Sequence, residues 1–195
     1  TGTNYVFAVN DSLTGVLEDV AAISALEVHD VAYSSSVQRL AISFLDLQGI
    51  SKTILFGTDG LPMRTFPGTS MVAFDNAGIA LAVAGSGSPY VEVASLATGE
   101  STRVFVCDGP ITSPNAIAIA TEAQGTQGVV GAVGAMGSMT VWDLPTGDKL
   151  FTHFTEGDDD MVSMAFAPGC TYAGGGGGGD GSSFDAANGT LSVFA

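Results

Sequence analysis

Basic side chains are scarce in this sequence. Five Lys and Arg residues stand against twenty Asp and Glu residues, which gives a formal net charge of −15 at pH 7. A charge of this sign and size repels the phosphates of nucleic acids and the anionic surface of a membrane. We therefore expect no direct nucleic-acid partner.

Long hydrophobic runs are also missing. Hydrophobic residues make up 46% of the chain, but polar residues and Gly interrupt them, and none of the runs approaches the roughly 20 residues of a membrane-spanning helix. The sequence predicts a soluble protein with no membrane insertion, and its 195 residues suit one folding unit. The start at Thr1 lacks the basic-then-apolar pattern of a signal peptide, so we expect either a processed start or a piece of a longer protein.

Cysteine and histidine occur only twice each. Cys107 and Cys170 have no second Cys or His at metal-ligand spacing, so the sequence holds no zinc motif and no CxxC redox pair. We expect buried free thiols, with a single disulfide as the alternative. His29 and His153 do not lie near a Ser, a Cys or an acidic pair in a catalytic order. The sequence thus predicts no enzyme, no catalytic residue, no metal and no cofactor.

The sequence does contain a series of short β-strand patterns. They are rich in β-branched or aromatic residues and are bounded by Gly, Pro, Asp or Ser. Helix signals are weak, and even the alanine-rich segment 16–26 predicts a strand because Val and Ile are interspersed. The clearest runs are residues 5–9, 41–44, 79–84, 90–93, 104–107 and 116–120.

A glycine marker recurs along the chain. Thr-Gly dipeptides end at Gly15, Gly99 and Gly147, with steps of 84 and 48 residues, and Gly60 divides the longer step into 45 and 39. Evenly spaced copies of a turn residue among short strands indicate an internal repeat.

A second sequence marker recurs with the same period as the glycine marker. It is an apolar strand that ends on an aromatic residue and is followed by a small polar turn and a second apolar strand. The aromatic residues are Tyr33, Phe74 and Phe166, which are 41 and 92 residues apart, and the second interval equals two steps of 46.

Two segments carry a resemblance to the WD-repeat family: GSMTVWDLPTGDKL at residues 137–150 and NGTLSVFA at residues 188–195. In that family each period of about 40 to 45 residues forms a four-stranded blade of a β-propeller. The resemblance implies an all-β fold with about four to five blades of four antiparallel strands, in a larger or incomplete ring. The implied repeats are residues 1–27 (partial), 28–68, 69–112, 113–158 and 159–195 (partial).

The repeats diverge from the family pattern. Trp142-Asp143 is the one Trp-Asp pair, the Gly-His dipeptide of the family is missing, and Met136 stands where the family has an acidic residue. We therefore expect the blades to be held mainly by apolar packing rather than by the family's hydrogen-bonded tetrad. The resemblance implies packing roles for Trp142, Asp143, Tyr33, Phe74, Phe166 and Phe194, with a surface hot spot as the alternative for Trp142.

Two loops are further candidates. Glu156, Asp158, Asp159 and Asp160 form the densest charge cluster, in a segment expected to join the outermost strand of one blade to the innermost strand of the next. This cluster is a solvated acidic loop or a docking patch for a basic segment of a partner, with weak divalent-cation binding as a third alternative. The glycines at 174–179 are not followed by the Lys of a phosphate-binding loop. They predict a flexible loop between the second and third strands of the last blade.

These features favour a non-catalytic scaffold that holds other proteins, such as the subunits of a multiprotein assembly, inside the cell (cytoplasm, nucleus or an organelle). The alternative is a secreted or cell-surface propeller for adhesion or ligand binding, because NYVFAVND and TVWDLPTG also resemble bacterial and archaeal YVTN-type repeats. An enzyme with its site in the central channel would need His and carboxylates on several inner strands, which are nearly devoid of them. The expected inner strands are residues 28–33, 70–74, 116–120 and 162–166.

Overall fold

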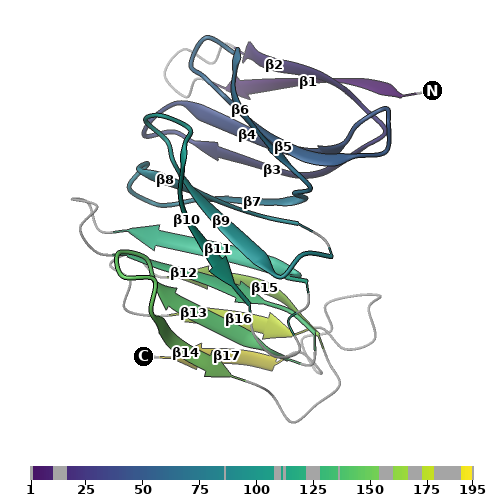
Figure 1. The fold of residues 1–195 in the computed structure, drawn as a ribbon. Helices are drawn as coiled ribbons and strands as arrows, with labels where there is room; N and C mark the ends of the chain where they lie inside the picture. The colour runs from purple at the N-terminus through teal and green to yellow at the C-terminus, as the bar shows by residue number, and fades with distance from the viewer. Residues whose placement is uncertain are drawn as a thin grey trace.

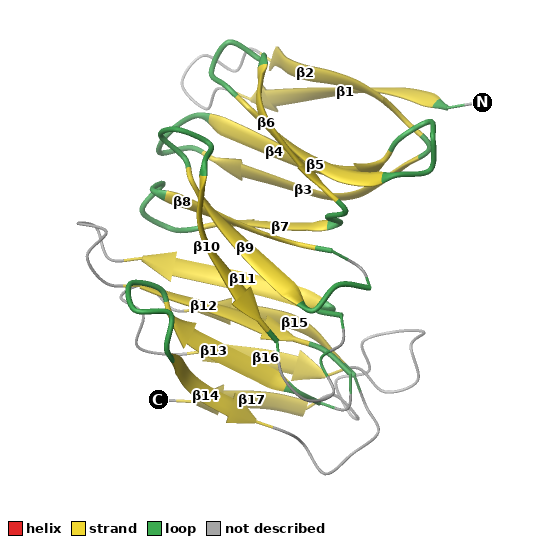
Figure 2. Ribbon diagram, in the orientation of Figure 1, coloured by secondary structure: helices red, strands yellow, loops and turns green. Residues whose placement is uncertain are grey.

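The fold consists of short antiparallel β-strands, and no helix occurs in the part of the chain that the structure describes (Figure 2). The structure is a computed structural model, and it describes residues 2–10, 17–85, 87–107, 111, 113–121, 128–135, 137–153, 160–166, 173–177 and 190–194. No membrane-spanning helix is found among the described residues.

The strands form five sheets in chain order, each built from consecutive antiparallel strands. Sheet 1 has β1 (Thr3–Asn10) and β2 (Leu17–Ala25). Sheet 2 has β3 (Glu27–Ser34), β4 (Arg39–Leu45), β5 (Ser51–Phe56) and β6 (Pro62–Pro67). Sheet 3 has β7 (Met71–Phe74), β8 (Ala80–Ala84), β9 (Tyr90–Ser95) and β10 (Ser101–Val106). Sheet 4 has β11 (Ala116–Thr121), β12 (Gly128–Val133), β13 (Met139–Asp143) and β14 (Lys149–His153). Sheet 5 has β15 (Met161–Phe166), β16 (Ala173–Gly177) and β17 (Thr190–Phe194).

The sheets pack face to face in the order of the sequence, from sheet 1 at one end of the molecule to sheets 4 and 5 at the other (Figure 1). The first strands of successive sheets, β3, β7, β11 and β15, contact one another and form the inner side of the array. The strands β6, β10 and β14 are the last strands of their sheets and lie on the outer side. Four-stranded antiparallel sheets arranged in this way are the blades of a β-propeller.

The hydrophobic core is divided among the interfaces between neighbouring sheets. Ile23 packs with Phe44 between sheets 1 and 2, and Phe66 packs with Leu81 between sheets 2 and 3. The same arrangement continues between sheets 3 and 4 and between sheets 4 and 5. Burial of each large side chain contributes about 1.5–3 kcal/mol, so each sheet depends on its neighbours for stability.

The glycine marker of the sequence lies at one structural position. Gly60, Gly99 and Gly147 each lie in the turn between the third and fourth strands of a sheet, with φ values of 72°, 73° and 84°. Side chains other than that of Gly rarely adopt this left-handed backbone conformation. The repeat is therefore visible in the sequence because the equivalent turn of each of these three sheets requires a Gly.

The glycine run is partly a strand, and the expectation of a flexible loop is wrong for residues 174–177. These residues belong to β16, which pairs with β15 on one side and with β17 on the other. A glycine backbone carries the same hydrogen-bonding groups as any other, so pairing on both edges compensates for its low strand propensity. Gly178 and Gly179 lie outside the described residues.

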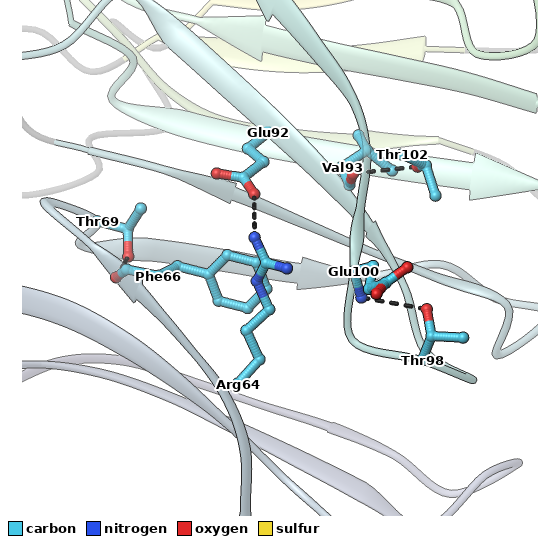
Figure 3. Close-up of polar contacts among 8 residues, drawn as sticks. All are labelled: Arg64, Phe66, Thr69, Glu92, Val93, Thr98, Glu100 and Thr102. Atoms are coloured by element: carbon cyan, nitrogen blue, oxygen red, sulfur yellow. Dashed lines mark hydrogen bonds and ion pairs between the residues drawn. The ribbon is translucent and has the colours of Figure 1, made fainter.

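Sheet 2 is stabilised by buried hydrogen bonds as well as by apolar packing. A chain of buried hydroxyl groups crosses this sheet. Ser43 Oγ lies 2.6 Å from Thr53 Oγ1, which lies 2.7 Å from Thr69 Oγ1. Thr69 Oγ1 is also 2.8 Å from the Phe66 carbonyl oxygen (Figure 3). The Thr69 hydroxyl is the donor towards both the Phe66 carbonyl and Thr53 Oγ1, which share its one proton, and either hydroxyl can donate between Ser43 and Thr53. In this sheet, buried hydroxyl groups therefore act beside the apolar packing that the sequence predicts as the main contribution.

Candidate functional site

Three of the residues expected in packing roles differ in burial. Trp142 on β13 is 3% exposed, and its ring centroid lies 5.5 Å from that of Phe105 on β10. Phe74 is half-buried at the end of β7, whereas Tyr33 on β3 is 39% exposed. Trp142 thus lies in the interface between sheets 3 and 4, and Tyr33 faces solvent to a larger extent.

Phe166 is half-buried on β15, and its ring lies close to Gly131 of sheet 4 together with Met164. Phe194 lies on β17, whose side chains are outside the described part of the structure.

Asp143 lies at the end of β13 and organises the turn that follows. Its Oδ2 accepts a hydrogen bond from the Thr146 N–H at 2.8 Å. Hydrogen bonds from the side chain and the backbone of Thr146, with a smaller effect of the Arg103 charge, hold the pKa of Asp143 below its ordinary value. The carboxylate therefore stays charged and stabilises the turn that Arg103 contacts from sheet 3.

Most of the predicted acidic loop is outside the described residues, namely Glu156, Asp158 and Asp159. Asp160 is described and exposed, and it directly precedes β15. The segment joins β14, the outer strand of sheet 4, to β15, the inner strand of sheet 5.

The two histidines lie on strands. His29 is exposed on β3, with Nδ1 3.9 Å from Glu27 Oε1. The His153 ring stacks on Phe151 with centroids 6.0 Å apart. The free thiol of Cys107 is buried, and burial raises its pKa to about 11, which makes it a poor nucleophile at neutral pH. Cys170 lies outside the described residues.

Contacts made by arginine side chains across sheet interfaces were not found by sequence reasoning. Arg64, the third residue of β6, lies with Nη2 3.4 Å from Glu92 Oε1 of sheet 3 and with its guanidinium 5.0 Å from the Phe66 ring centroid (Figure 3). Arg103, the third residue of β10, donates to the carbonyl oxygens of Pro145 and Thr146 of sheet 4, each at 2.6 Å. The 39-residue spacing of the two arginines was the available signal.

A third basic side chain is held within its own sheet. Lys52 Nζ lies 2.9 Å from Asp46 Oδ2. The Ile50 N–H, followed by the Lys52 ammonium, lowers the pKa of Asp46 below its ordinary value. Of the five basic residues of the chain, Lys52, Arg64 and Arg103 are therefore committed to internal contacts, and the sequence contains four acidic residues for each basic one.

Carboxylates and amides make further contacts between sheets. Asp30 Oδ2 on β3 accepts the Val72 N–H of β7 at 3.0 Å. Asp75, after β7, accepts a short hydrogen bond from the Thr121 hydroxyl of β11. Asn115, before β11, donates to the Met161 carbonyl of β15 at 3.1 Å. These contacts fix the inner strands relative to one another.

Three cavities lined by described residues each hold at most one charged side chain. One of about 300 Å³ lies along the inner strands and is lined by apolar residues of β7, β11 and β15, with Asn76 at its edge. Another of about 320 Å³ lies between sheets 3 and 4 beside Arg103. Within the described ranges, no group of three or more His, Cys, Asp or Glu side chains could hold a metal ion.

Comparison with known proteins identifies the fold. No protein-family model and no curated protein matches the sequence. Among solved structures, 856 chains match. One is a chain of the "Crystal Structure of Mitotic Checkpoint Complex", with a TM-score of 0.66 and 14% sequence identity. The match covers 91% of the present chain and 55% of that chain. Together with the four-stranded antiparallel sheets, this likeness shows that the chain has the fold of a partial β-propeller.

Proposed function

We propose that this chain is a non-catalytic interaction scaffold, a propeller of the WD-repeat kind that holds other proteins within a larger assembly. The observation that carries the proposal is the distribution of charge on the fold. A net charge of −15 remains on the chain while three of its five basic side chains are tied into contacts within or between sheets. A rigid acidic surface of this kind favours partners with basic segments.

The WD-repeat assignment is supported by the position of its best motif. Trp142 of the Trp-Asp pair is buried against the neighbouring sheet, and the glycine marker occupies the same turn in sheets 2, 3 and 4. A protein of the same fold occurs in a structure of a multiprotein assembly, the mitotic checkpoint complex. We place the protein inside the cell, because its Cys107 is a free thiol and reducing compartments maintain free thiols.

The acidic loop is the first surface to test as a docking site. The variant Glu156→Gln/Asp158→Asn/Asp159→Asn removes three charges, and Glu27→Gln/Asp59→Asn/Asp148→Asn removes three exposed charges elsewhere as a matched control. Each protein is used as bait, and the partners of the unmodified chain are identified and then titrated in purified form.

We expect stable partners with basic segments, whose binding weakens in the loop variant and not in the control. Binding is also expected to weaken as salt rises from about 0.1 M to about 1 M, since the Debye length falls from about 10 Å to about 3 Å. A chain that purifies alone, has no stable protein partner and turns over a small-molecule substrate would contradict the proposal.

A further inference from the structure

The outer strand of sheet 3 has an edge without a strand partner. β10 (Ser101–Val106) is the last strand in the order β7–β8–β9–β10 and pairs only with β9 among the strands of the described structure. An unpaired strand edge presents a row of N–H and C=O groups that another extended chain can bind.

The direction of the backbone groups of β10 follows from one hydrogen bond. The Cys107 N–H, directly after β10, donates to the Pro89 carbonyl on the β9 side at 2.8 Å. Successive residues of a strand alternate the side to which their N–H and C=O point. The backbone groups of Phe105 therefore face β9, and those of Val104 and Val106 point outward from the edge.

The two residues with outward backbone groups, Val104 and Val106, also have exposed apolar side chains. Val104 and Val106 are 53% and 51% exposed, and Tyr90, directly opposite Val106 on β9, is 50% exposed. Side chains in such positions lie on one face of the sheet and within contact distance of each other. They form an apolar patch, which we call the β10 patch, defined by Tyr90, Val104 and Val106.

A groove adjoins the β10 patch. It has a volume of about 260 Å³ and lies between the end of β6 and the outer half of sheet 3. Pro67, Gly68 and Thr69 line one side, and Tyr90, Glu92 and Val104 line the other. An extended segment paired with β10 has space here for side chains that point towards sheet 2.

The edge of β10 also lacks the features that protect its counterparts. β6 carries Pro62 and Pro67 at its ends, and β14 begins with an exposed Lys149, and both residue types block the addition of strands at an edge. β10 contains neither Pro nor Lys. Its single charged residue, Arg103, is bound to carbonyl oxygens of sheet 4.

The charged side chains near the edge of β10 favour one sign of charge on the segment that binds there. Glu100 is exposed immediately before β10, and it supplies the local negative charge, because Glu92 in the groove is paired with Arg64. Arg103, the one basic residue of β10, is occupied by its contacts with carbonyl oxygens of sheet 4. The net charge of −15 repels a second copy of the chain and attracts a basic segment.

We infer that the outer edge of β10 is a docking site for an extended, lysine- or arginine-flanked segment of a partner protein, which adds to sheet 3 as a fifth strand and places alternate apolar side chains on the β10 patch. The inference rests on the proposed scaffold function and names one surface through which that function operates.

The test uses the full chain and a defined probe, a fluorescein-labelled peptide of the sequence KKVTVTVKK, with EEVTVTVEE as its charge-reversed counterpart. Val104→Pro removes an outward N–H and no bond to β9, so it blocks the edge without breaking the sheet. Thr65→Pro is the matched control, because Gly68 N–H donates to Ser51 on the β5 side and the alternation places the Thr65 N–H outward on β6. Circular dichroism and thermal melting check that both variants fold.

We expect saturable binding of the lysine-flanked peptide by fluorescence anisotropy, weakened about tenfold or more by Val104→Pro and unchanged within about twofold by Thr65→Pro. If Val104→Pro fails to fold, Val104→Lys/Val106→Lys replaces it, since both side chains are exposed, and the same loss is expected. Amide exchange of Val104 and Val106 is expected to slow when the peptide binds.

Equal binding by Val104→Pro, or equal binding of the glutamate-flanked peptide, would overturn the inference. The scaffold proposal is tested separately by the partners of the unmodified chain. If those partners bind Val104→Pro as tightly as the unmodified chain and the peptide does not bind, the edge is not the docking site and the scaffold stands.

Discussion

Two glycines at contacts between sheets differ in what a side chain would meet. A Cβ on Gly85 would overlap with the backbone carbonyl oxygen of Gly68, whereas a Cβ on Gly131 would overlap mainly with the end of the Met164 side chain and to a smaller extent with the Phe166 ring. The Gly68 carbonyl cannot move aside without displacing the backbone of the turn that follows β6, but a methionine side chain can change rotamer.

Gly85→Ala is therefore expected to destabilise the chain by about 3 kcal/mol or more, and Gly131→Ala by about 1 kcal/mol. Urea unfolding of both variants measures the difference, and Gly131→Ala/Met164→Ala tests whether removing the methionine relieves the clash. Equal costs for the two single substitutions would show that the approach of Gly68 to Gly85 is not a rigid contact.

The buried thiol of Cys107 predicts a pH dependence of stability. Burial raises the pKa of this thiol from its ordinary value of 9.0 to about 11. Between these values the folded chain keeps a proton that the unfolded chain loses, so the free energy of unfolding falls as pH rises through this window. Urea unfolding of the unmodified chain and of Cys107→Ala, at a pH below 9.0 and at one near 11, is expected to show a steeper fall in the unmodified chain. Parallel pH profiles would contradict the prediction.

At the level of the strand, the outer strands β6 and β10 are each attached to a neighbouring sheet by an arginine. The Arg103 guanidinium binds two carbonyl oxygens of the β13–β14 turn, and a lysine ammonium does not reproduce this planar fork. Because the contact is exposed to solvent, we expect Arg103→Lys to cost about 1 kcal/mol.

Arg64→Lys serves as the comparison for Arg103→Lys. Arg64 makes one polar contact, of 3.4 Å to Glu92, beside its position over the Phe66 ring, so its substitution by Lys, which keeps the positive charge, is expected to cost less in the same urea unfolding experiment. A larger effect of Arg64→Lys than of Arg103→Lys would show that the turn carbonyls are not the main partners of Arg103.

Most strands could be predicted from the sequence because their patterns are local. The segment 16–26 was predicted as a strand, and the structure has β2 at Leu17–Ala25. β16 could not be predicted, because a glycine run has no side-chain periodicity and its pairing is decided by β15 and β17. Propensity alone assigns such a run to a loop.

Contacts between repeats were harder to predict from the sequence than the strands were. Arg103 binds carbonyl oxygens 42 and 43 residues further along the chain, and backbone acceptors leave no trace in residue identity. The hydroxyl chain of sheet 2 was missed for a related reason. Ser43, Thr53 and Thr69 are common residue types, and only the register of β4 against β5 brings Ser43 opposite Thr53.

At the scale of the whole molecule, stability is shared between neighbouring sheets, because each hydrophobic cluster joins two of them. Within sheets 2, 3 and 4, the two middle strands are paired on both edges, and the outer strands β6, β10 and β14 are paired on one. We expect hydrogen exchange to be slowest in the middle strands, such as β8, β9 and β12, and faster in the outer strands. Measurement of exchange by mass spectrometry or NMR checks this order, and uniform protection across all strands would contradict it.

The open edge of β10 has a consequence for the behaviour of the protein in solution. Two copies could in principle join edge to edge, as exposed strands do in aggregates. The excess of fifteen negative charges opposes this and gives the protein colloidal stability near neutral pH. Acidification that protonates the carboxylates, or high salt, removes the repulsion while the edge remains. The protein is therefore best stored at neutral pH and low ionic strength. We expect acidification to cause aggregation, seen as turbidity, through the same edge of β10 to which a partner would bind.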